Sequence, residues 1–266
     1  MKGQLSRWLL GKRLATNQLL HEKFGVFWGL PILASDAISS VAYAVEEMLY
    51  ILVPAIGILS YVWLPQVAGA IIVLLVILTL SYRQTVEAYP GGGGAYIVAK
   101  DNLKPIFGLV VGASLTIDYT LTVAVSVSAG TAAITSAFPV LFNHRVVVAV
   151  IIIVLMVIGN LRVVRESSKI FGVPTYAFLF TTLALIAAGI YKYYAGSPPT
   201  PPVPAVAANV DLGLQSVSLF LLLRAFSSGC AALTGVEAIS DAVPSFREPS
   251  VQNAKRTYVL LAAAVM

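Results

Sequence analysis

The sequence predicts an all-α integral membrane protein, and three observations carry that prediction. Of the 266 residues, 58% are hydrophobic and only 11% are charged. The mean hydropathy is +0.88. Six apolar stretches approach or exceed the roughly 20 residues of helix that cross the hydrocarbon core. Because a soluble domain carries about 25% charged residues, this chain has too few polar side chains to cover a water-exposed surface.

The expected membrane spans cover residues 27–53, 62–82, 106–138, 146–161, 171–194 and 214–243, and they contain few charged residues. A seventh apolar run begins at residue 258, and the chain ends inside it at residue 266. Residues 1–26 precede the first span, and we expect them to form a cytosolic N-terminal arm. Residues 27–266 are expected to form a truncated transmembrane domain with helices 1–6 and the start of helix 7.

The first span contains a carboxylate, Asp36, within the polar run at residues 35–43 (SDAISSVAY). An ionisable side chain at membrane depth is costly unless it is paired or hydrated, so it is a functional candidate. The small hydroxyl residues beside it favour a local helix break, whose freed carbonyls can line a cavity. A tight packing seam would explain Ser39 and Ser40 but leaves Asp36 without a role.

The second span, 62–82, is uninterrupted and leads into a glycine run at residues 89–96 (YPGGGGAY). Glycine runs can hold phosphate, but the lysine and Ser/Thr of a phosphate-binding loop are absent here. We expect a tight turn on the cytosolic side.

The third span places Asp118, Thr122 and Ser126 at positions i, i+4 and i+8, with Tyr119 beside them. On an α-helix these positions drift by only about 80°, so the three side chains share a face. A carboxylate with two hydroxyls suits a desolvated cation or a proton path. An interhelical hydrogen-bond seam is the alternative.

The fourth and fifth spans contain no carboxylate, and 146–161 lies near the lower length limit for a crossing. A Pro- and Ala-rich spacer follows at residues 196–209. In the sixth span, Gly229 and Gly235 flank a short stretch that ends at Glu237. Because each glycine costs about 1 kcal/mol in a helix relative to alanine, this stretch predicts a discontinuous helix. Interrupted segments at corresponding places in two halves point to a transporter site.

Basic residues predict the topology. Most of the 17 Lys and Arg residues lie in the N-terminal arm or in the loops after spans two, four and six. The opposite side has only Arg145 and Lys192, and Arg224 lies within a span. The positive-inside rule therefore places the N-terminus in the cytosol.

Other functional classes lack their signals in this sequence. The basic residues are scattered between apolar runs and form no patch, so we expect no nucleic-acid partner. His21 and His144 lie in loops far from the acids, and Cys230 has no obvious base. We therefore expect no enzyme, no catalytic residue and no cofactor. The repeated carbonyl-ring motif of a channel filter is also absent.

The polar segments together resemble a known transporter superfamily. Residues 89–96 resemble the P-x-G-G-x-Y element of amino acid–polyamine–organocation (APC) permeases. Residues 35–43, 118–122 and 231–240, with Arg83-Gln84, look like the KimA-type potassium/proton symporters of that superfamily. The resemblance runs from about residue 12 to the C-terminus.

The resemblance implies the N-terminal part of a LeuT-like 5+5 inverted-repeat fold with helices 1 and 6 broken. It also implies a multi-pass protein of the plasma membrane that forms a homodimer at full length and takes up potassium driven by protons. The ion-site positions of the family fall on Asp36, Tyr43, Asp118, Tyr119, Thr122, Ser126, Thr234 and Glu237. The expected potassium ligands among them are Asp36, Tyr43, Asp118, Thr122, Ser126 and Thr234.

An amino acid or amine permease is the alternative. Such sites meet the substrate carboxylate with free backbone N–H groups at the broken first helix. Asp36 lies at the corresponding break and would repel that group, which favours potassium or a polyamine over a zwitterion. The proton carrier is expected to be Glu237 or one of the two aspartates.

Overall fold

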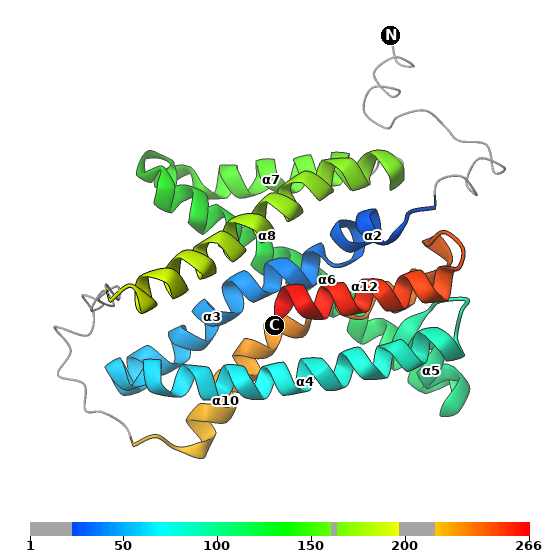
Figure 1. Ribbon diagram of the computed structural model, residues 1–266, viewed down its shortest axis with the longest axis horizontal. Coiled ribbons are helices and arrows are strands. Elements are labelled where there is room, and N and C mark those ends of the chain that lie inside the picture. The colour runs from blue at the N-terminus through cyan, green and yellow to red at the C-terminus, as the bar shows by residue number, and fades with distance from the viewer. Residues whose placement is uncertain (1–22, 161–163, 197–215) are drawn as a thin grey trace, which may run out of the picture.

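The computed structural model describes residues 23–160, 164–196 and 216–266 (Figure 1). Within these ranges the chain is helical and contains no strand, apart from one isolated bridge between Phe24 and Phe246. Most of the expected N-terminal arm and nearly all of the expected spacer at residues 196–209 lie outside the described residues.

The long helices coincide with the expected spans. They are α2 (Val26–Leu33) with α3 (Ser35–Ile56), α4 (Ser60–Ala88), α6 (Pro105–Ala137), α7 (Arg145–Asn160), α8 (Val164–Tyr194) and α10 (Leu219–Gly229), followed by α12 (Ser250–Val265). Among the described residues, five segments are long and apolar enough to cross a membrane. One of them, Ser35–Ala88, reverses direction at Gly57–Leu59 and contains the adjacent helices α3 and α4 (Figure 1). The protein is therefore a multi-pass, all-α membrane protein.

Two segments differ from the expectation. Helix α5 (Gly94–Asn102) follows the glycine run, and its short, charged sequence gave no span signal. It packs closely on α6, because a Cβ at Gly108 would lie 2.8 Å from the Lys100 side chain. Helix α12 begins at Ser250, earlier than residue 258. Its buried residues (Ala254, Thr257, Tyr258 and Leu261) form one helical stripe that polar neighbours conceal from a hydropathy average.

Two apolar clusters stabilise the bundle along α3 and α4. One contains Ile38, Leu75 and Tyr258, and the other contains Met48, Leu52 and Ile71. Between them, Ser40 is completely buried. The α3 sequence therefore places a polar layer between two apolar ones.

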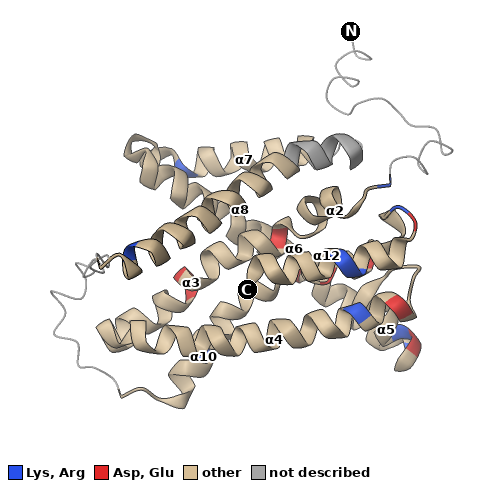
Figure 2. Cartoon of the chain, in the orientation of Figure 1, with Lys and Arg blue, Asp and Glu red and all other residues tan. Residues whose placement is uncertain are grey.

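Charged side chains concentrate at one end of the bundle (Figure 2). This charged end comprises α5, the end of α4 and the starts of α2 and α12. Ion pairs there join Lys23 to Glu248 and Lys255 to Glu87. The Phe24 N–H also donates to the Ser245 carbonyl at 3.1 Å, so the start of α2 is held against the turn before α12.

Candidate functional site

The first helix is interrupted beside Asp36. Helix α2 ends at Leu33 and α3 begins at Ser35, and between them Ala34 has φ −112° and ψ 1°. Pro31 within α2 has no N–H for the Phe27 carbonyl, and the Tyr176 hydroxyl of α8 donates to that carbonyl at 2.5 Å. Asp36 lies in the first turn of α3, where the positive end of the helix dipole favours a negative charge.

The sixth span is interrupted opposite Asp36. Helix α10 ends at Gly229, as the glycine pair predicts, and a 3-10 segment (Cys230–Leu233) and a turn lead to α11 (Ala238–Asp241). Gly235 has φ +77°, and a Cβ there would lie 2.6 Å from Asp36 Oδ2. Only glycine fits this position, so the two interruptions meet at the Asp36 side chain.

A chain of hydroxyl groups connects the two interruptions to α6. The Ser40 hydroxyl lies 2.8 Å from the Tyr43 hydroxyl and 2.9 Å from that of Thr234. Ser126 of α6 donates to the Tyr43 hydroxyl at 3.5 Å, and Thr234 donates to the Ala231 carbonyl at 2.9 Å. Ser40 was not among the expected site residues, because its sequence position does not distinguish a packing serine from a bridging one.

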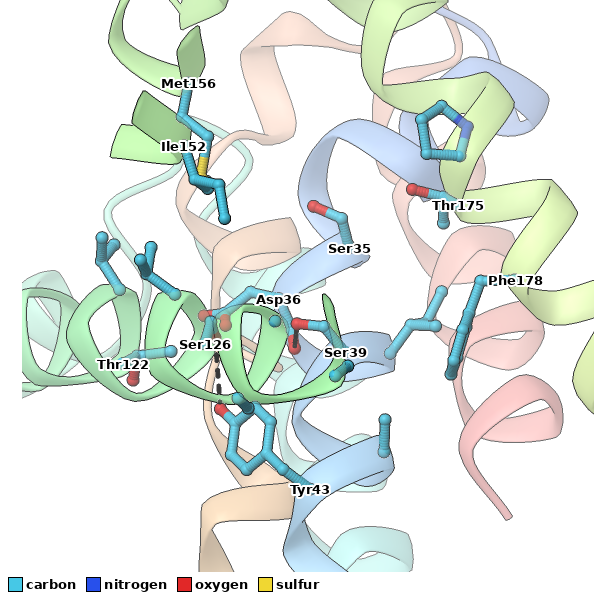
Figure 3. Close-up of a pocket in the computed structure, with 18 of the residues that line it drawn as sticks. Ser35, Asp36, Ser39, Tyr43, Thr122, Ser126, Ile152, Met156, Thr175 and Phe178 are labelled. Carbon is cyan, nitrogen blue, oxygen red and sulfur yellow. Dashed lines mark hydrogen bonds between the residues drawn. The ribbon is translucent and has the colours of Figure 1, made fainter. Parts of the chain in front are cut away.

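A cavity of about 820 Å³ opens beside this chain, between α3, α6, α7 and α8 (Figure 3). Polar side chains line one part of it: Ser35, Asp36, Ser39, Tyr43, Glu46, Tyr119, Thr122, Ser126 and Thr175. Apolar residues such as Ile152, Met156 and Phe178 line the rest. No Lys or Arg of the described chain lines the cavity, so its field favours cations.

The eight expected site residues divide into two groups. Five line the cavity, namely Asp36, Tyr43, Tyr119, Thr122 and Ser126, and Thr234 is connected through Ser40 to the lining residue Tyr43. Asp118 is close enough to Asp36 for charge repulsion but does not line the cavity. Glu237 also lies outside the cavity lining.

Glu237 belongs to a second polar cluster, toward the charged end. It is 6% exposed, and its Oε1 has no hydrogen-bond partner among the described residues. Tyr119 donates to Asp241 Oδ2 at 3.2 Å. The backbone N–H of Ser240 donates to the Tyr258 hydroxyl at 3.1 Å. Asp241 was not among the expected site residues, since the turn that folds it back toward Tyr119 is not evident from the sequence.

The glycine run lies against this second cluster. The Gly93 N–H donates to the Asp241 carbonyl at 3.4 Å. Gly92 and Gly94 both have positive φ, and side chains there would collide with Asp241. The run is thus more than a turn, since its glycines allow the backbone to approach Asp241 closely.

Comparisons with known proteins support the interpretation of this chain as part of a membrane transporter. A family model described as amino acid permease matches residues 25–266. The potassium transporter KimA of Bacillus subtilis (strain 168) is 46% identical over 263 residues, which cover 98% of this chain and 42% of that protein. The chain therefore spans less than half the length of this relative. Both descriptions are of transport proteins and neither is of an enzyme. From the match over almost its whole length, we conclude that the chain belongs to the amino acid permease family.

Proposed function

We propose that the intact protein is a secondary transporter that takes up potassium with protons by alternating access. The observation that carries this proposal is the Asp36 carboxylate at the meeting point of two helix interruptions, in a cavity lined without Lys or Arg among the described residues. The relative described as a potassium transporter supports the same substrate.

The position of Asp36 favours a cation over an amino acid. The first turn of α3 offers the backbone N–H groups that would otherwise hold a substrate carboxylate. Asp36 already provides a carboxylate at this point, and Asp118 adds the same charge nearby. Tyr43, Thr122, Ser126 and Thr234 complete a set of oxygen donors of the kind that replaces the hydration shell of potassium.

The two interruptions support alternating access in a LeuT-like 5+5 inverted repeat, of which this chain supplies helices 1–6 and the start of helix 7. Discontinuous helices place their ends at the binding site, and rocking of one helix group against the other exposes the site alternately. The close contact of Gly235 with Asp36 couples the two broken helices, so movement of one displaces the other.

The charged end is proposed to face the cytosol, with the arm at residues 1–26. The positive-inside rule supports this orientation, because Lys23, Lys100, Arg247 and Lys255 lie at that end. Inward movement of each positive charge then gains about 2.3 kcal/mol per 100 mV of membrane potential.

Glu237 is the proposed proton carrier. Its buried Oε1 has no hydrogen-bond partner in the described part of the chain and is costly when charged, so a proton or a cation must neutralise it in part of the cycle. A tenfold proton gradient contributes about 1.4 kcal/mol per proton, which adds to the electrical term.

An amino acid or amine permease is the second candidate. The family description favours it, as does a cavity of about 820 Å³, which is far larger than one bare ion needs. A homodimer of the intact protein is a further expectation from the resemblance, and the mass of the detergent-solubilised protein would test it.

The deciding experiment is growth of a potassium-uptake-deficient bacterium on limiting potassium, with the full-length protein expressed. We expect rescue by the wild type, loss of rescue with Asp36→Asn or Asp118→Asn, and full rescue with Asp101→Asn, whose side chain is exposed on α5. Absence of rescue by wild-type protein present in the membrane, together with uptake of a labelled amino acid, would establish the second candidate instead.

A further inference from the structure

We propose that Glu237, Tyr119 and Asp241 form a proton relay that carries the symported proton from the ion site toward the charged end. The proposal rests on the proton-coupled uptake proposed above. It adds Asp241, which lies outside the ion-site positions inferred from the resemblance.

The Tyr119 hydroxyl connects the two carboxylates. It donates to Asp241 Oδ2 at 3.2 Å, so Asp241 accepts this hydrogen bond. Tyr119 also lies beside the Glu237 carboxylate and interacts with it. Because a phenol hydroxyl both donates and accepts, its oxygen can take a hydrogen from Glu237 while its own hydrogen moves to Asp241.

Glu237 has the properties expected of the group that holds the proton before transfer. It is almost completely buried, and its Oε1 has no hydrogen-bond partner within the described residues. A charged oxygen in that position is poorly solvated, so the protonated form of Glu237 is favoured. Asp241 is only partly buried and lies under the glycine run, next to the charged end. The relay therefore leads from the buried acid to the more accessible one.

The groups around the relay provide no fixed positive charge within the described chain, so a proton is the ligand that neutralises its carboxylates. The titratable neighbours are Asp118 on α6, Tyr82 on α4 and Tyr258 on α12. Tyr82 and Tyr258 stack with ring centroids 6.0 Å apart. Within the described chain no Lys or Arg is among the groups that interact with Glu237 or Asp241, so no fixed cation neutralises the two acids.

The step balances within the three side chains. The O–H bond of protonated Glu237 breaks as its proton joins the Tyr119 oxygen, and the Tyr119 O–H bond breaks as its proton joins Asp241 Oδ2. Glu237 ends as a carboxylate, Tyr119 is unchanged and Asp241 ends as a neutral acid. Asp241, which is partly exposed, then loses the proton to water.

Two assays on the full-length protein in proteoliposomes test the relay. Rubidium accumulation driven by an acidic exterior requires proton release at every turnover, whereas rubidium exchange at equal concentrations does not. For Asp241→Asn we expect accumulation to fall by about a hundredfold or more, because a positioned proton-transfer group typically contributes about 10²–10⁴-fold. Exchange should fall much less.

The matched control is Asp101→Asn on α5, which removes an exposed carboxylate at the same end and should change neither assay. Equal loss of accumulation and exchange in Asp241→Asn would overturn the relay, since a cation ligand or a structural residue affects both. Unchanged accumulation would overturn it as well. A wild-type protein inactive in both assays would instead reject the proposed potassium transport on which the relay rests.

Discussion

The interrupted helices and the α7–α8 pair have similarly apolar sequences but bury different shares of their residues. In the most apolar 18-residue stretch of Leu219–Asp241, 33% of the residues are buried. None is buried in the corresponding stretches of Pro139–Gly159 and Gly172–Tyr194. Figure 1 shows α7 and α8 at one edge of the molecule, away from α4 and α10. Among the described residues the outer pair thus leaves most of its apolar side chains exposed, as a lipid-facing surface requires, whereas the sixth span buries more of its own against protein.

The difference shows where sequence constraints are strict. A lipid-facing position accepts any apolar side chain, because lipid tails adapt to its shape. A position between the interrupted helices must satisfy packing, hydrogen bonds and backbone conformation at once. Substitutions of the same type in the two regions should therefore have very different effects.

The largest contrast is expected between two glycines. Gly235→Val would force a branched side chain into a positive-φ position against Asp36, whereas a Cβ at Gly189 of α8 has nothing within 4 Å. Rubidium uptake by the intact protein should be lost with Gly235→Val and retained with Gly189→Val, at equal amounts of protein in the membrane. Similar uptake by the two variants would contradict the close contact at Asp36.

Two leucines should differ next most strongly. Leu52 of α3 is 0% exposed and Leu185 of α8 is 74% exposed. Leu52→Ala leaves a cavity and should cost about 2–5 kcal/mol of unfolding free energy. Leu185→Ala should stay within about 0.5 kcal/mol of wild type. Thermal unfolding in detergent measures both, and equal losses would mean that α8 is buried in the intact protein.

The hydroxyl chain allows a test between two serines. Ser40→Ala removes the bridge between Tyr43 and Thr234 and should cost about 1–3 kcal/mol, together with weaker rubidium binding. Ser128→Ala is the control, because the exposed Ser128 donates only to the Ala124 carbonyl of its own helix. If Ser40→Ala kept wild-type affinity and stability, the bridge would not organise the site.

The smallest effect is expected at the charged end. Glu248 is exposed, and the hydrogen bond from the Ser250 N–H, with Lys23 nearby, lowers its pKa. A lowered pKa in the folded state stabilises the protein above the ordinary pKa, and this contribution is lost as the pH falls through the lowered value. The small difference in Tm between wild type and Glu248→Gln should therefore shrink on acidification. A difference that grew toward low pH would contradict this assignment.

Much of the fold could be predicted from composition and periodicity. Helices α6 and α7 lie within one residue of the expected spans, and α2 with α3 covers the first span to within three residues. A long apolar run satisfies its backbone hydrogen bonds in lipid when it forms a helix. Helix α5 was missed, since a short helix with Lys100 and Asp101 resembles a polar loop. The early start of α12 was missed because its buried stripe is interleaved with polar residues.

The sequence by itself determined the membrane class, the interruption near Gly229 and the acids that membrane depth makes costly, since these follow from hydropathy and from the properties of single residues. Only the tertiary structure decided which of those acids share a site. It placed Asp36 against Gly235, bridged Tyr43 to Thr234 through Ser40, and joined Tyr119 to Asp241 in a separate cluster that contains Glu237. These contacts join positions far apart in the chain, and helical periodicity carries information about neighbours on one helix but none about the helix that packs against it.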